Sequence, residues 1–341
     1  MSARVTARLA ARLTLLAAAP AALLAAPLAA QESLILVSNE RSHDVTVLDA
    51  GTLRPVATIP VGARPRGIHL SPDGRLAYVA LSDDRPRQEG RGDAIAVVDL
   101  ATRRVTARHA AGSDPEQFAL TPDGRRLYAS NEDAGTASAT DLRTGRVQAT
   151  LVVGIEPEGV AVSPDGRWVY VTAETSNTVS VIDTRSDEVV TTFLVDVRPR
   201  AAAFAPDGRR AYVTCEIGGT VAVVDVARHE VVATIPVGDG SAKPVGVAVA
   251  PDGRRVYVAL GRANAVAVID PARRRVVDSI PVGRRPWNLA LSPDGRRLYV
   301  ANGVSDDLSV VDLATGRVTA TVKTGRGPWG VAVGRAGRLR R

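Results

Sequence analysis

The chain has 341 residues, 45% of them hydrophobic, so it is long enough to bury a large core and too apolar to be disordered. Its formal net charge is +7, and three of the positive charges belong to Arg4, Arg8 and Arg12, so the remaining excess is too small to predict nucleic-acid binding. The single cysteine, Cys215, excludes an intrachain disulfide, a cysteine-based metal site and a c-type haem attachment.

Residues 1–30 have the composition of a secretory signal peptide. The three arginines precede an apolar stretch that starts at Leu13, and small residues surround the end of the segment at "APLAAQES". A membrane anchor is the competing interpretation, because the apolar stretch approaches the length that spans a bilayer. Pro20, Pro27 and the alanine-rich end favour cleavage. We therefore expect a mature chain of residues 31–341, with no membrane span, in an exported compartment such as the bacterial periplasm.

A repeat of about forty residues follows the signal peptide. The tripeptide Pro-Asp-Gly begins at positions 72, 122, 164, 206, 251 and 293. Each copy has a segment such as "GVAVS", the turn "PDGR", and segments such as "RLYVAN", "VSVID" and "VVATIPVG". Alternating Val, Ile, Ala and Tyr between Gly, Pro, Asn and Asp residues predict four strands per copy. A period near forty with four strands is typical of β-propeller blades.

The two ends of the mature chain each hold part of one repeat. The first copy, "SLILVSNE", starts at the second strand, and the last ends after a first strand at 330–333. Pairing these two segments completes a seventh blade and leaves no free inner edge. The sequence therefore predicts an all-β, seven-bladed propeller of four-stranded antiparallel blades, closed by its C-terminal strand.

Side chains at the start of the innermost strands are expected to surround the mouth of the central channel. Each connection between blades contains a proline whose neighbours vary, and the expected rim residues are Arg64, Arg66, Glu116, Glu156, Glu158, Arg198, Arg200, Lys243, Arg285, Trp287 and Trp329. Tryptophans beside a charged rim suit a pocket for an organic ligand with carboxylates. The alternative is that the charges pair between blades while the tryptophans fill apolar gaps.

Four blades carry a glutamate at the end of the second strand. These residues are Glu40, Glu132, Glu174 and Glu216, and the matching positions in the other blades hold Ser82, Gly261 and Gly303. The uneven distribution indicates more than folding, although the same carboxylates suit pairing with nearby arginines. We add these four to the expected ligand or partner rim.

The histidines and the cysteine predict no metal or catalytic site. The four histidines are spread over different strands and turns without metal-ligand spacing. Burial is the simplest interpretation of His69 and Cys215. The polar loop at 82–93 is suited equally to a lid, a docking arm or a tolerated insertion.

Several phrases resemble a known family. "RLYVAN", "VSVID" and "VVATIPVG" resemble the YVTN propeller repeats, and "GARPRGIHLSPDG", "GIEPEGVAVSPDG", "CEIGGTVAVVD" and "GRGPWGVAV" are similar to the propeller proteins associated with PQQ-dependent catabolism. The resemblance implies an exported protein beside alcohol oxidation by quinoprotein dehydrogenases and a linked ABC transport system. It carries no catalytic residues, and residues 85–92 depart from its pattern.

Two functions are open at this point. We expect a non-catalytic binding or scaffold protein without a cofactor, whose partner is a quinoprotein dehydrogenase, a cytochrome, a transport component or a small organic ligand. The alternative is an enzyme, a metal-dependent propeller lactonase or other hydrolase that uses carboxylates such as Glu40, Glu132, Glu174 and Glu216.

Overall fold

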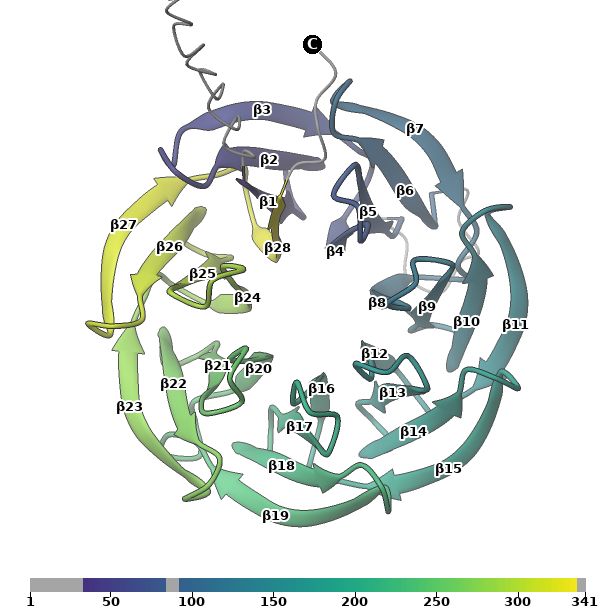
Figure 1. Cartoon of the computed structure of the whole chain (residues 1–341), viewed down its shortest axis with the longest axis vertical. Helices are drawn as coiled ribbons and strands as arrows, with labels where there is room; N and C mark the ends of the chain where they lie inside the picture. Colours follow the sequence, from purple (N-terminus) through teal and green to yellow (C-terminus); the bar gives the residue numbers. More distant parts are fainter. Residues whose placement is uncertain (1–32, 84–91, 336–341) are drawn as a thin grey trace, which may run out of the picture. The chain divides into compact units, whose positions relative to one another are not determined.

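A computed structural model describes residues 33–83 and 92–335. The predicted signal peptide, most of the 82–93 loop and the last six residues lie outside the described part of the chain. The described residues form 28 strands and no helix. The strands make seven antiparallel sheets of four strands each, arranged as a ring (Figure 1). The predicted seven-bladed propeller is thus confirmed.

Each blade has the same order of strands from the channel outward (Figure 1). We number the blades 1 to 7 in chain order, blade 1 being the one that contains β1. The innermost strands are β28 (Pro328–Arg335), β4 (Pro65–Leu70), β8 (Pro115–Leu120), β12 (Pro157–Val162), β16 (Pro199–Phe204), β20 (Pro244–Val249) and β24 (Pro286–Leu291). The second strands are β1 (Ser33–Asn39), β5 (Leu76–Leu81), β9 (Arg126–Asn131), β13 (Trp168–Ala173), β17 (Arg210–Cys215), β21 (Val256–Leu260) and β25 (Arg297–Asn302).

The two outer positions of each blade are equally regular. The third strands are β2 (Asp44–Asp49), β6 (Ala94–Asp99), β10 (Thr136–Asp141), β14 (Thr178–Asp183), β18 (Thr220–Asp225), β22 (Ala265–Asp270) and β26 (Asp307–Asp312). The outermost strands are β3 (Pro55–Pro60), β7 (Arg104–His109), β11 (Arg146–Val152), β15 (Glu188–Leu194), β19 (Glu230–Pro236), β23 (Arg275–Pro281) and β27 (Arg317–Lys323).

The last strand closes the ring as the sequence predicts. β28 pairs antiparallel with β1, with Leu36 opposite Ala332 and Ile35 opposite Val333. Segments about 300 residues apart in the chain therefore share blade 1, and β1 has a partner on both sides. The pairing satisfies backbone groups that an open edge would leave exposed.

The core lies between neighbouring blades. Second and third strands are buried on both faces because each sheet packs against the next, whereas β27 alternates between exposed and half-buried residues along the outside. One cluster joins Ile35 and Leu48 of blade 1 to Tyr299 and Val310 of blade 7. The six tyrosines of the second strands are all buried and pack in this core.

The turns show why two kinds of aspartate recur. Asp49, at the end of β2, accepts a 2.6 Å hydrogen bond from the Thr52 backbone N–H and so fixes the turn to β3. Asp73 accepts hydrogen bonds from the Ser71 hydroxyl and the Arg75 N–H, and the following glycine adopts φ 67°. These carboxylates therefore stabilise the hairpin turns.

Within residues 33–83 and 92–335, no helix is long and apolar enough to cross a bilayer.

Candidate functional site

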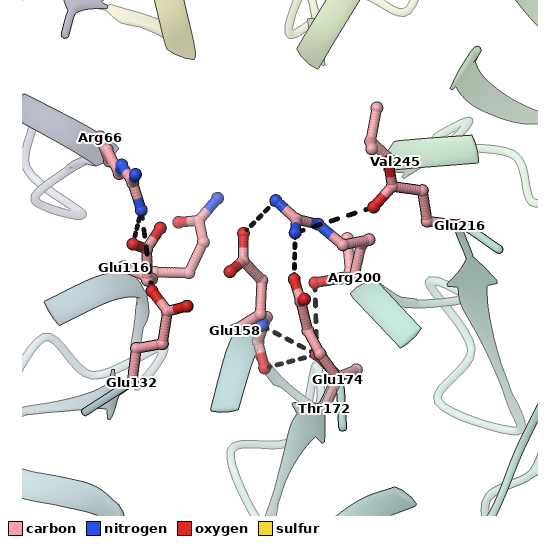
Figure 2. A network of polar contacts seen from close by, with 12 residues as sticks. Arg66, Glu116, Glu132, Glu158, Thr172, Glu174, Arg200, Glu216 and Val245 are labelled. Carbon is pink, nitrogen blue, oxygen red and sulfur yellow. Dashed lines mark hydrogen bonds and ion pairs between the residues drawn. The ribbon is translucent and has the colours of Figure 1, made fainter. Parts of the chain in front are cut away.

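The second residue of each innermost strand lies at one mouth of the channel. In blade order from blade 2 these residues are Arg66, Glu116, Glu158, Arg200, Val245, Trp287 and Trp329. Figure 2 shows the charged side chains of Arg66, Glu116, Glu158 and Arg200 converging there. Beside them is a cavity of about 720 Å³ whose lining includes the arginines at 64, 66, 198 and 200 and the carboxylates at 114, 132, 156 and 158.

The first half of the network is centred on Arg66. Its guanidinium contacts Glu116 and lies 4.0 Å from the carboxylate of Glu132 (Figure 2). It also lies 3.1 Å from the Glu40 carboxylate. Arg64 lies 3.7 Å from the same Glu40 carboxylate. Glutamates at the ends of β1 and β9 thus reach the rim, although their strands are second from the axis.

The second half repeats this arrangement around Arg200. Its guanidinium lies 2.8 Å from Glu158, contacts Glu174 and lies 3.8 Å from Glu216 (Figure 2). Arg198 lies 2.7 Å from Glu174 and 3.2 Å from Glu216. The expected pairing of arginines and glutamates between blades therefore occurs, and it brings all four second-strand glutamates to the same mouth.

Hydroxyl groups hold the backbone of this rim. Ser38, Ser130, Thr172 and Thr214 each donate a hydrogen bond to the carbonyl of the rim residue in the next blade, which is Arg66, Glu158, Arg200 or Val245 in turn. The Thr172 hydroxyl also accepts a 2.8 Å hydrogen bond from the Gly159 N–H. These four residues were not among those expected at the rim. Their signal is that Ser or Thr stands two positions before the glutamate in the same four blades.

Burial perturbs the ionisation of the glutamates. Burial, with repulsion from Glu158, raises the pKa of Glu174 to about 8 against the opposing effect of Arg200. Burial likewise raises the pKa of Glu158, which Arg200 opposes. Burial and the Asp114 charge raise the pKa of Glu132, opposed by Arg66. Two carboxyls with raised pKa values, Glu132 and Glu158, therefore line an accessible cavity, a combination common at functional sites.

Blades 6, 7 and 1 form a different part of the rim. The Arg285 guanidinium stacks 4.2 Å from the centre of the Trp287 ring and lies 3.6 Å from Glu216. Trp329 is only 4% exposed, so the two tryptophans do not form the exposed aromatic wall that their spacing suggests. Lys243 forms no ion pair with a described residue.

Glu156 also lines the cavity. Its carboxylate accepts a 2.5 Å hydrogen bond from the Thr175 hydroxyl.

One cluster of three carboxylates at this mouth has the spacing of metal ligands. Oxygen atoms of Asp114, Glu116 and Glu132 lie within 4.8 Å of one another. The Arg66 guanidinium already contacts Glu116, and Arg64 lies 3.6 Å from Asp114. The four second-strand glutamates do not assemble into a ligand set, because guanidinium groups stand between them. The local charge balance is therefore provided by arginine.

His69 and Cys215 lie outside the network. His69 packs edge-on against Phe118, and burial lowers its pKa to about 4. Cys215 is fully buried, and burial raises the pKa of its thiol to about 12. Both observations agree with the packing roles predicted for them.

Two family models match separate parts of the chain. Residues 196–334 match the lactonase seven-bladed β-propeller family, and residues 39–193 match the choice-of-anchor I domain. The lactonase match includes Arg198, Arg200, Glu216 and Arg285, whereas Glu132, Glu158 and Glu174 fall in the other match. No curated protein matches the chain by sequence.

Solved structures share the fold at low sequence identity. Two proteins described as "putative 6-phosphogluconolactonase", from Bacteroides fragilis and Bacteroides uniformis, each superpose with a TM-score of 0.75 at 19% identity, covering 89% of this chain and 98% and 100% of theirs. Kuenenia stuttgartiensis hydrazine synthase superposes with a TM-score of 0.73 at 23% identity, covering 82% of this chain and 92% of that one.

These matches contradict the expectation of a non-catalytic scaffold linked to PQQ-dependent catabolism. The family model over the C-terminal blades describes a lactonase, and two structural neighbours carry a lactonase description. The enzyme alternative is the better supported interpretation. The scaffold prediction was wrong because it depended on phrases of the repeat, and strand and turn residues specify the blade architecture and not the chemistry at its mouth.

Proposed function

We propose that the protein is a hydrolase that opens the ring of a lactone at the mouth of the propeller channel. The observation that carries the proposal is the pairing of Glu132, whose pKa is raised by burial, with the Arg66 guanidinium at 4.0 Å beside an accessible cavity. The lactonase family match and the two lactonase-described neighbours support the same reaction class.

The residues supply what ester hydrolysis requires. A carboxylate with a raised pKa is a better proton acceptor, so Glu132 is suited to take a proton from the attacking water. The water oxygen bonds to the lactone carbonyl carbon, and the carbonyl oxygen gains negative charge. Guanidinium N–H groups of Arg66 and Arg64 face the cavity and stabilise such an oxyanion.

Ring opening needs a proton for the leaving oxygen. Glu158 lines the cavity, and burial raises its pKa, so its carboxyl is suited to hold a proton for this step. Burial and repulsion from Glu158 raise the pKa of Glu174 to about 8. When the ring C–O bond breaks, the Glu158 proton passes to the ring oxygen. The products are a hydroxyl and a carboxylic acid on one molecule, so lactone and water are fully accounted for.

The test is a hydrolysis assay with purified mature protein. The substrates are 6-phosphogluconolactone, chosen because two structural neighbours are described as putative 6-phosphogluconolactonases, and the uncharged δ-gluconolactone. We expect turnover of at least one, and a loss of about 100-fold or more in kcat for Glu132→Gln, the size typical of a general base. Glu188→Gln, on an outer strand, is the control. Absence of turnover in the wild type, or unchanged kcat in Glu132→Gln, overturns the proposal.

Chelation separates this reaction from a metal-assisted one. We expect full activity after dialysis against EDTA because arginines balance the charge of Asp114, Glu116 and Glu132. Activity that is lost on dialysis and restored by a divalent cation would instead assign a cation to those three carboxylates, and would overturn the arginine-based mechanism.

We propose periplasmic export from the character of residues 1–30, and a tagged full-length chain followed by cell fractionation tests it. The resemblance to YVTN repeats stays a prediction about the repeat type. Pull-down from the same cells tests the predicted dehydrogenase, cytochrome and transport partners.

A further inference from the structure

Arg285 lacks the two second-strand glutamates that Arg198 has at the corresponding positions of its own blade and the preceding one. Arg198 and Arg285 occupy the same repeat position, directly before the proline of an innermost strand. Arg198 lies between the second-strand glutamates of its own blade and the preceding one, at 3.2 Å from Glu216 and 2.7 Å from Glu174. The two corresponding positions around Arg285 are Gly303 and Gly261.

Arg285 nevertheless points into the rim. Its guanidinium stacks on Trp287 at 4.2 Å, and the same ring lies 5.6 Å from the Arg200 guanidinium. The stack depends on a glycine, because a Cβ at position 303 would lie 2.5 Å from Trp287 Cδ1. Gly303 therefore removes a carboxylate and also makes room for the ring that supports Arg285.

Three guanidinium groups share one carboxylate at this end of the rim. Glu216 lies 3.2 Å from Arg198, 3.6 Å from Arg285 and 3.8 Å from Arg200. Burial lowers the pKa of Arg285, and the charges of Arg200 and Arg198 lower it further against the effect of Glu216. The Arg285 side chain is still 31% exposed, so an additional anion can reach it.

We propose that Arg285 and Arg198, with Trp287 as their support, form a subsite for an oxyanion, either a carboxylate or a phosphoryl group. Guanidinium groups bind both through paired N–H donors. Arg198 also lines the cavity of about 720 Å³, which places the subsite at the edge of the reaction centre. The assignment of this oxyanion to a substituent of the lactone rests on the proposed function. The existence of an anion-binding subsite does not depend on it.

The repeat suggests a direct test, which is to replace Gly261 with the glutamate that four other blades carry at this position. A Cβ there would meet the Lys243 carbonyl at 3.4 Å and Arg285 Nε at 3.5 Å, which are ordinary contacts. Gly261→Glu therefore places a carboxylate beside Arg285 without crowding. Gly261→Gln adds the same volume without charge, and Arg285→Met removes the cation with its stem retained. Arg284→Met, one residue earlier and exposed, is the control.

Binding of inorganic phosphate and of malonate is measured by calorimetry at constant ionic strength. We expect Gly261→Glu and Arg285→Met to weaken binding at least tenfold, and Gly261→Gln and Arg284→Met to change it less than twofold. Tighter binding of phosphate assigns a phosphoryl group, and tighter binding of malonate a carboxylate. No binding by the wild type, or equal affinity in wild type and Arg285→Met, overturns the subsite.

The two proposals fail separately. Anion binding that depends on Arg285, in a protein that hydrolyses no lactone, keeps the subsite and removes the lactonase. Lactone turnover with anion affinity unaffected by Gly261→Glu keeps the lactonase and removes the subsite.

Discussion

Glu174 should make the folded protein less stable as the pH rises through 8. Its carboxyl is 3% exposed, and burial beside Glu158 raises its pKa from 4.5 to about 8. A group whose pKa is raised by folding binds its proton more tightly in the native state, so the stability it contributes is lost as the pH rises through the folded pKa. Between pH 7 and pH 9 the expected loss is about 1.4 kcal/mol, a tenfold change in the unfolding constant.

Urea unfolding of wild type, Glu174→Gln and the exposed-residue control Glu188→Gln at pH 7, 8 and 9 measures this effect. We expect wild type and Glu188→Gln to lose the same free energy of unfolding, and Glu174→Gln to lose about 1.4 kcal/mol less. The buried thiol of Cys215, whose pKa is also raised, contributes equally to all three proteins and cancels. Identical pH dependence in wild type and Glu174→Gln would refute the claim that Glu174 holds a proton in the native state.

Two further predictions concern the blade contacts that hold the site. Thr172→Val removes the hydroxyl that donates a hydrogen bond to the Arg200 carbonyl and accepts one from the Gly159 N–H. It should lower the free energy of unfolding by about 1–3 kcal/mol and reduce kcat, whereas Thr172→Ser should keep both near the wild-type values. An unchanged kcat in Thr172→Val would contradict the positioning role of the hydroxyl. Ala332→Asp places a charge in the buried face of β28 and should destabilise the protein by about 3 kcal/mol or more in thermal unfolding. Arg335→Asp, exposed at the end of the same strand, should have little effect, and equal melting temperatures for the two variants would show that ring closure does not stabilise the fold.

The architecture was predictable from the sequence because each blade repeats the same local signals. Alternating apolar residues define strands, and the Pro-Asp-Gly turns define hairpins. The half-repeat that starts at Ser33 and the one that ends near Val333 each lack the strands that the other supplies, so the sequence alone also predicts the pairing of β1 with β28. These features depend on neighbours in the chain or on a fixed period.

The site was predictable only in part. The rim residues and second-strand glutamates were identified by comparing equivalent positions among blades, and the structure brings most of them together. The scaffold function was wrong, because residues typical of the repeat carry no information on the reaction. Trp329 was expected at the rim and is buried, since a repeat position specifies a place in the blade but not the side chains that cover it.

By itself, the sequence determined the number of blades, the closing strand and most of the charged residues at one mouth of the channel, because these follow from local hydrogen bonding and from periodicity. Only the tertiary structure decided which arginine pairs with which carboxylate. Arg198 pairs with two glutamates, whereas the corresponding positions around Arg285 hold glycines. Which carboxylates each arginine contacts depends on the distances between blades. Burial at those distances raises the pKa values of Glu132, Glu158 and Glu174, and it turns a rim of ordinary charged residues into a candidate site for proton transfer.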